Sequence, residues 1–304
     1  MLKKYTFNKV TWVDVENPTK EDIDTLLNEY NLDPEIAQEL TLPTYKPRVK
    51  SYGDYLYMVL HFPAFKHSHG EEPKQEIDFV IGKDFIITGR YNPIDQLEKV
   101  IKIFEVNTLL NKNDSTSDAG HLFYFIIKEL FKSVIDEIDF VNDSLKNIER
   151  KIFQGKEKEM VIALSKVSRN LLEFKNIIMS QNETITNFEQ YGRSFFNKNL
   201  SYSLSNIVSE HYKIEQSIEK NIILLQELRE TNNSLLSTKQ NEIMKTLTII
   251  TFIVMPFSIV NGFFQILTVN TPLIGHRYDW YLIVGTETFL VGCMYTYARK
   301  KKWF

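Results

Sequence analysis

One uncharged run near the end of the chain constrains the fold more than any other feature. Leu247 to Leu267 gives 21 residues without a charged side chain, and a helix needs about 20 residues to cross the hydrocarbon of a bilayer. A second run, Trp280 to Ala298, has 19 residues and one charge, Glu287. About a dozen residues join the two runs, so the sequence predicts a hairpin of two transmembrane helices in a lipid bilayer.

Charged residues predict the orientation of this hairpin. Residues 299–302 read Arg-Lys-Lys-Lys directly after the second run, and such a cluster stays in the cytosol by the positive-inside rule. Two crossings return the preceding 245 residues to the same side. The opening "MLKKYTFNKV" has no apolar stretch after its lysines, unlike a cleaved signal peptide. We therefore expect a multi-pass protein of the cytoplasmic membrane with both termini in the cytosol.

Composition and motifs argue against two classes of protein, nucleic-acid binders and enzymes. The chain has 36 basic and 39 acidic residues, whereas a nucleic-acid partner would call for a clear surplus of Lys and Arg. The single cysteine, Cys293, leaves no disulfide framework and no thiolate cluster for zinc. The sequence has no phosphate-binding loop, zinc-protease motif or serine elbow. We expect neither a nucleic-acid partner nor an enzyme.

The polar part of the chain predicts an α+β cytosolic domain followed by long α-helices. Short runs rich in β-branched and aromatic residues indicate strands, and Pro-Thr or Asn-Pro starts indicate helices between them. The predicted strands are residues 11–15, 55–62, 76–82 and 84–91, and the predicted helices are residues 18–30 and 92–106. We expect four segments: an α/β domain over 1–115, a helical hairpin over 116–198, a stalk helix over 199–245 and the two-span transmembrane domain over 246–304.

Glycine and proline become rare after residue 120, which favours long helices. Helices over 120–154 and 157–189 would pack antiparallel, with Gly155 in the turn. From about Leu200 nothing interrupts a third helix before Pro256, so one helix of roughly 100 Å can run from the cytosol into the membrane. Its cytosolic part carries a mainly apolar seam that calls for partner helices, most simply copies of itself: Ile207, His211, Ile214, Ile218, Ile222, Leu225 and Leu228.

A polar stripe continues the same three- and four-residue spacing into the membrane. Its members lie on one helical face, and none is a branched aliphatic or an aromatic residue: Asn241, Met244, Thr248, Thr251, Met255, Ser258, Gly262 and Gln265. Small polar residues let transmembrane helices pack closely. They can equally line a wet axial path, where their oxygens replace part of the hydration shell of a cation. Met244 and Leu247 could then close the path by dewetting.

The stretches "NEIMKTLTIITFIVMPFSIVNGFF" and "KKKWF", with "TWVDVENPTKEDIDTLLNEYNLDPEIAQEL" and "KPRVKSYGDYLYMVL" upstream, resemble the CorA family of magnesium transporters. The resemblance covers essentially the whole chain. It implies a homopentamer with a funnel-shaped cytosolic part, whose first span lines an axial pore. It also implies that Mg2+ or another divalent cation is transported and binds the cytosolic domain as a closing signal.

The chain departs from the Gly-Met-Asn signature that ends the first span in this family. Counted without gaps, the signature falls on Gln265, Ile266 and Leu267; counted back from "NTPLIG", it falls on Thr268-Val269-Asn270. We favour Asn270 as the entrance residue, because a ring of Leu267 would offer no oxygen to an ion. For the regulatory site, the family's stalk aspartate falls on Asn206, with Glu210 nearby. An amide is a poorer ligand for a hard cation than a carboxylate.

Glu287 leaves further alternatives open. An ionisable residue within a span is functional by default, so Glu287 could carry protons in a proton-coupled Zn2+ transporter of the ZntB type. It could equally pair with Asn261 of the first span, off the polar stripe.

The loss of the entrance signature also allows a non-conducting, membrane-tethered metal sensor or scaffold. Our main expectation is a CorA-like channel that conducts divalent cations, most of all Mg2+, into the cytosol.

Overall fold

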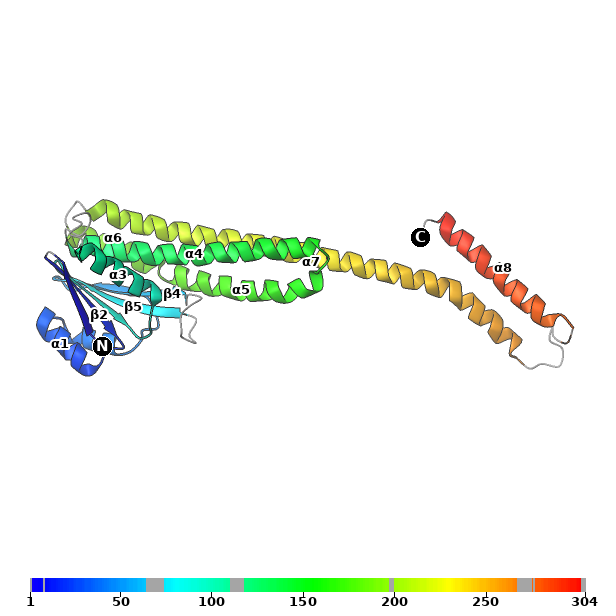
Figure 1. Ribbon diagram of the computed structural model, residues 1–304, viewed down its shortest axis with the longest axis horizontal. Coiled ribbons are helices and arrows are strands. Elements are labelled where there is room, and N and C mark those ends of the chain that lie inside the picture. The colour runs from blue at the N-terminus through cyan, green and yellow to red at the C-terminus, as the bar shows by residue number, and fades with distance from the viewer. Residues whose placement is uncertain are drawn as a thin grey trace. The chain divides into compact units, whose positions relative to one another are not determined.

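The computed structural model describes residues 2–7, 9–63, 74–109, 118–196, 200–266, 275 and 277–301. Contacts divide the chain into two units, Met1–Arg229 and Glu230–Phe304. The elements, drawn in Figure 1, are β1 (Leu2–Phe7), β2 (Val10–Glu16), α1 (Lys20–Tyr30), α2 (Pro34–Thr41), β3 (Arg48–Ser51), β4 (Leu56–Pro63), β5 (Lys74–Ile81), β6 (Phe85–Arg90), α3 (Asp95–Leu109), α4 (Ala119–Phe153), α5 (Glu157–Ser180), α6 (Asn182–Phe195), α7 (Ser201–Phe264) and α8 (Asp279–Lys300). The finer division into four segments stays a prediction.

The sheet confirms the four predicted strands and adds two at its edges. The strand order is β1-β2-β6-β5-β4-β3. Strands β2 and β6 run parallel, and the other neighbouring pairs are antiparallel. The sequence does not predict β1 and β3, which are edge strands that carry lysine or arginine. Strand β4 is buried along its whole length, as expected where helices cover both faces of a sheet.

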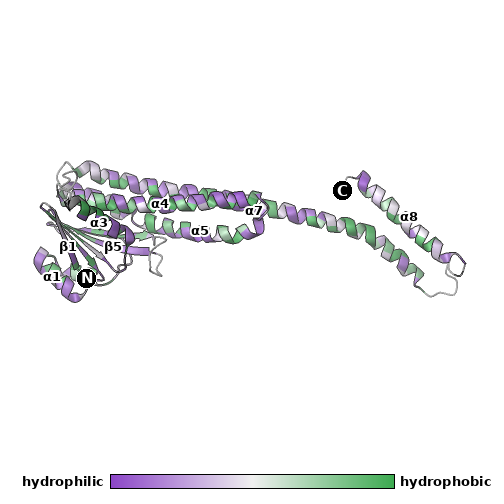
Figure 2. Cartoon of the chain, viewed as in Figure 1, coloured by the Kyte–Doolittle hydropathy of each residue, from purple (hydrophilic) through white to green (hydrophobic). Residues whose placement is uncertain are grey.

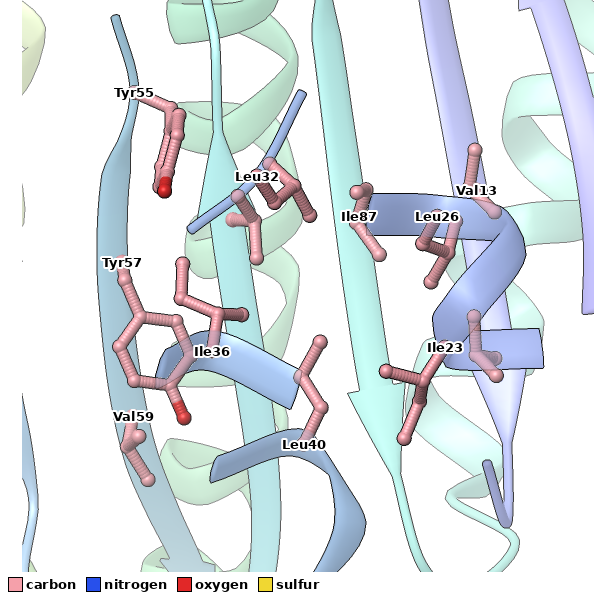
Figure 3. Close-up of a cluster of buried hydrophobic side chains, with 12 residues drawn as sticks. Val13, Ile23, Leu26, Leu32, Ile36, Leu40, Tyr55, Tyr57, Val59 and Ile87 are labelled. Carbon is pink, nitrogen blue, oxygen red and sulfur yellow. The ribbon is translucent and has the colours of Figure 1, made fainter. Parts of the chain in front are cut away.

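Helices pack on both faces of this sheet. Helices α1 and α2 lie on the face away from α4 (Figure 1). N-caps fix the starts of both helices. Thr19 forms a capping box with Asp22 at the start of α1, and the side chain of Asp33 caps α2. Figure 3 shows the core beneath them, which includes Val13, Ile23, Leu26, Leu32, Ile36, Leu40, Tyr55, Tyr57, Val59 and Ile87. On the opposite face, the ring centroids of Phe79 and Phe123 of α4 are 5.3 Å apart.

Helices α4 and α5 form the predicted hairpin, with Gly155 turning the chain at a φ of 87° that glycine adopts without strain. The prediction of a single helix over 157–189 is wrong, because the chain leaves helical geometry at Gln181, where φ is −107° and ψ is 5°. The Gln181 side chain turns into the sheet instead. Its Nε2 donates to the backbone oxygen of His61 at 3.1 Å, and its Oε1 accepts from the backbone nitrogen of His61 at 3.3 Å.

Helix α7 runs without interruption from Ser201 to Phe264 and confirms the single helix predicted from about Leu200 into the first span. Most of its mainly apolar seam is buried within its own chain, so the expectation that copies of the stalk would cover the seam is wrong. Helices α4 and α5 are the partners: the rings of His211 and Phe131 are 5.8 Å apart, and Lys175 pairs with Glu219 at 2.7 Å. Burial lowers the pKa of His211 to about 4, which keeps this seam residue uncharged at neutral pH.

A buried carboxyl group lies within the sheet at Asp78 of β5. The hydroxyls of Tyr57 and Tyr91 donate to its two oxygens at 3.2 and 3.1 Å, and the residue is 0% exposed. Burial, followed by the charge of Glu76, raises the pKa of Asp78 well above its ordinary value of 3.8. The folded protein therefore retains a proton that the unfolded chain has released above about pH 4, so this carboxyl lowers stability as pH rises.

We expect Asp78→Asn to raise the melting temperature of the purified full-length protein at pH 7.5. The gain should shrink as the pH falls toward 4, because the wild-type carboxyl is then protonated in both states. Tyr91 can accept from the new amide, since its hydroxyl also lies 3.3 Å from the carbonyl of Glu39. Thermal melting followed by circular dichroism at both pH values measures the effect. A lower melting temperature at both values would show that the carboxyl stabilises the fold as an acceptor.

Candidate functional site

Among the described residues, α7 is the one helix long and apolar enough to cross a membrane. Figure 2 shows hydrophobic residues gathering toward its C-terminal end. The second predicted run forms α8. Glu287 and several Gly, Thr and Tyr residues make α8 less apolar than the C-terminal half of α7. A second crossing therefore stays a prediction.

The C-terminal half of α7 has two different faces. One face carries apolar residues and lies against α8. The ring centroids of Phe252 on α7 and Tyr297 on α8 are 6.4 Å apart. The partly or fully buried residues of this half are Ile249, Phe252, Ile253, Pro256, Val260 and Phe264, with the polar Asn261 at the flank. The eight residues of the polar stripe, from Asn241 to Gln265, are all exposed, and Leu247 is 54% exposed. At 3.6 residues per turn the two faces lie on roughly opposite sides of the helix, so the stripe is not used to pack α8.

The hydroxyl groups of the stripe bond to their own helix. Thr248, Thr251 and Ser258 each donate to the carbonyl four residues earlier, at 2.8, 2.9 and 3.3 Å. Such bonds are usual for Ser and Thr within helices. The stripe therefore presents hydroxyl oxygen atoms. Between Met244 and Gln265 the helix has one charged residue, Lys245, and this residue lies off the stripe.

Glu287 lies on the side of α8 that faces α7. The buried or half-buried residues of α8 fall at steps of three and four and mark this side: Asp279, Ile283, Glu287, Val291, Met294 and Ala298. Glu287 is 7% exposed, and its Oε1 has no hydrogen-bond partner among the described residues. The amide of Asn261 donates to the carbonyl of Phe257 at 3.2 Å, and, among the described residues, it forms no bond to this Oε1. Glu287 is thus turned to the apolar face of α7 and not to the stripe.

The predicted regulatory residues have little support from local geometry. Asn206 is half-buried on α7, and Glu210 pairs with Lys213 of the same helix at 2.7 Å. Within the described ranges, no group of three or more His, Cys, Asp or Glu residues could hold a metal ion. A metal site at Asn206 and Glu210 stays a prediction. Leu267 and Asn270 lie outside the described residues.

Curated relatives match nearly the whole chain at low identity. The chain is 20% identical to the cobalt/magnesium transport protein CorA of Thermotoga maritima, covering 96% of this chain and 83% of that protein. It is 21% identical to the putative metal ion transporter YfjQ of Bacillus subtilis, covering 96% and 89%.

Solved structures agree on the fold. The CorA magnesium transporter of Methanocaldococcus jannaschii superimposes with a TM-score of 0.83 at 17% identity, over 100% of this chain and 95% of that chain. The cytoplasmic domain of ZntB from Vibrio parahaemolyticus gives 0.62 at 12% identity, over 76% and 90%. A family model described as "CorA-like Mg2+ transporter protein" matches residues 7–300. The chain therefore belongs to the CorA-like Mg2+ transporter family, whose members are membrane transporters and not enzymes.

Proposed function

We propose that five copies of this chain enclose an axial pore lined by the polar stripe of α7 and conduct divalent cations, Mg2+ above all, into the cytosol. The observation that carries the proposal is the exposure of the whole stripe on the face of α7 away from α8. A face of this kind is unfavourable against lipid and useful around a wet path. The membrane potential would drive cations inward, at about 2.3 kcal/mol per charge for each 100 mV.

The proposed topology has two crossings in the cytoplasmic membrane. Helix α7 lines the pore and α8 lies outside it, with the N-terminal unit and the basic C-terminal end in the cytosol. The cluster at residues 299–302 supports this orientation. Asn270 would form the entrance ring, and Asn206 with Glu210 a weak regulatory cation site between subunits.

The position of Glu287 favours a channel over a proton-coupled Zn2+ transporter. Glu287 is turned toward α7 on the side away from the stripe, so it does not line the proposed ion path. We therefore infer that protons do not drive transport. The similarity to the ZntB cytoplasmic domain is a likeness of fold and does not decide the coupling.

Purified protein in liposomes that hold a Mg2+-sensitive dye tests the function. We expect influx when a K+ diffusion potential makes the inside negative, and influx independent of a pH gradient. Glu287→Gln should carry the same flux, because the amide keeps the size of the side chain and only its acidity is lost. If no divalent cation enters, the protein is the non-conducting scaffold. If Zn2+ enters only with a pH gradient and Glu287→Gln stops it, the protein is proton-coupled.

A further inference from the structure

A cavity of about 440 Å3 opens in the N-terminal unit, beside the start of strand β5. Its walls come from three segments that are far apart in the sequence: the loop after α2 (residues 43–45), the start of β5 (residues 74–76) and the residues between β6 and α3. Small-molecule sites usually measure about 300–1,000 Å3. The cavity belongs to Met1–Arg229, whereas the polar stripe belongs to Glu230–Phe304, so the proposed pore does not use it.

The carboxylate in the cavity wall is already satisfied by hydrogen bonds. Glu76 is 9% exposed, and its Oε1 accepts from the backbone nitrogen and the hydroxyl of Thr44 at 2.8 and 2.9 Å. Its Oε2 lies 2.9 Å from the same nitrogen and 3.1 Å from Nε2 of His61. A carboxylate has about four lone-pair sites, and these contacts occupy them. The ligand of this cavity is therefore not a metal ion held by Glu76.

Gln75 supplies the unused polar group of the cavity. The residue is 4% exposed, and its Nε2 donates to the backbone oxygen of Pro93 at 3.4 Å, which determines which end of the amide is the oxygen. Among the described residues, Oε1 has no hydrogen-bond partner, and a buried acceptor without a partner is unfavourable. Gln75 thus has a free acceptor beside the second N–H of the same amide. Glutamine reads the N6 amino group and N7 of adenine with this pair of groups.

Lys74 and two tyrosines complete the walls. The Lys74 ammonium donates to the backbone oxygen of Tyr45 at 3.3 Å and lies 5.1 Å from the centre of the Tyr45 ring. An ammonium has three hydrogens, so the described contacts leave two for an anionic group. Tyr45 is 86% exposed, which leaves ring surface for a planar ligand. The hydroxyl of Tyr91 donates to Oδ2 of Asp78 at 3.1 Å, which holds the second ring in place.

We propose that this cavity binds an adenine nucleotide, with the base on Gln75 and the phosphate on Lys74. The N6 amino group donates to Oε1 of Gln75, and N7 accepts from the free N–H of the amide. Lys74 is the one basic residue among those that line the cavity, so a monophosphate is sufficient. A 6-oxo purine carries an acceptor where adenine carries a donor, and it would leave Oε1 without a partner. The inference does not depend on the proposed transport.

Isothermal titration calorimetry of the purified full-length protein tests the proposal with two probes, adenosine monophosphate and inosine monophosphate. The inosine nucleotide has an oxygen in place of the N6 amino group. We expect the adenosine nucleotide to bind with a Kd below about 1 mM and the inosine nucleotide to bind at least about tenfold more weakly, because its oxygen faces the unpaired Oε1. Failure of both nucleotides to bind, or equal affinities for the two, would overturn the proposal.

Two variants assign the binding to this cavity. Gln75→Met removes the amide at nearly constant length and should abolish the preference for the adenosine nucleotide. Gln96→Met is the matched control, because Gln96 is half-buried on α3 and does not line the cavity; its affinities should equal those of the wild type. The proposal is wrong if the Gln75 variant keeps the preference or if the Gln96 variant loses it.

Lys74→Met gives an independent result if the Gln75 variant fails to fold, since Lys74 is partly exposed. The variant should bind adenosine monophosphate about tenfold more weakly than the wild type does, and adenosine without a phosphate equally well. Thermal melting followed by circular dichroism shows which variants are folded. An unchanged affinity of the Lys74 variant for the monophosphate would show that the phosphate does not lie on Lys74, and would overturn the proposed binding mode.

Discussion

Gly262→Leu is expected to abolish divalent-cation flux, lowering it more than about a hundredfold, while the protein still folds and assembles. Gly262 belongs to the stripe, and apart from its chain neighbours and its own helical backbone no atom of the described residues lies within 4 Å of a Cβ placed on it. A single subunit therefore accommodates the leucine. In the proposed pentamer, five leucines would meet on the axis and close the path by dewetting as well as by their volume. Dye-loaded liposomes measure the flux, and size-exclusion chromatography measures the assembly.

Gly292→Leu provides the comparison for this prediction. Gly292 on α8 likewise has no described atom within 4 Å of a placed Cβ, other than its chain neighbours and its own helical backbone, and it is exposed, off the side of α8 that faces α7. The substitution adds the same apolar volume at a position away from the proposed axis, so flux should stay at the wild-type level. A conducting Gly262 variant beside a blocked Gly292 variant would show that ions do not pass along the stripe.

The course of α7 could be predicted because it depends on local chemistry. A run without Gly or Pro from Leu200 to Pro256 permits one helix, and the structure has that helix. The strands of the sheet likewise follow from their β-branched and aromatic residues. The break at Gln181 gives no such signal, because glutamine is a good helix former and its departure depends on a strand 120 residues earlier in the chain.

The candidate site divides in the same way. Spacing alone places the stripe on one face, because helix geometry fixes which residues are neighbours. Spacing does not tell which helix covers a given face. The seam around Ile214 has the pattern of an oligomer interface, yet α4 and α5 of the same chain cover it. The turn of Glu287 toward α7 also depends on how two helices pack, and one sequence does not contain that information.

Gln181→Leu is expected to destabilise the N-terminal unit by about 3 kcal/mol. The amide of Gln181 takes the place of a β3 residue beside His61. The pairing of Arg48 with Val59 would place residue 46 opposite His61, but β3 begins only at Arg48. Pro47 has no N–H and could not extend the ladder there. Leucine would fill the space and leave the buried N–H and C=O of His61 without partners, at roughly 1–3 kcal/mol for each group.

Thermal melting of the full-length protein, followed by circular dichroism, measures this loss. About 3 kcal/mol corresponds to a melting temperature lowered by roughly 6–12 °C in a unit of this size. Gln154→Leu, at the exposed end of α4, makes the same chemical change outside the sheet and should shift melting by less than about 2 °C. Equal melting temperatures for the two variants would mean that water satisfies His61 when the amide is gone. The junction of α5 and α6 would then contribute packing, and not hydrogen bonds, to the sheet.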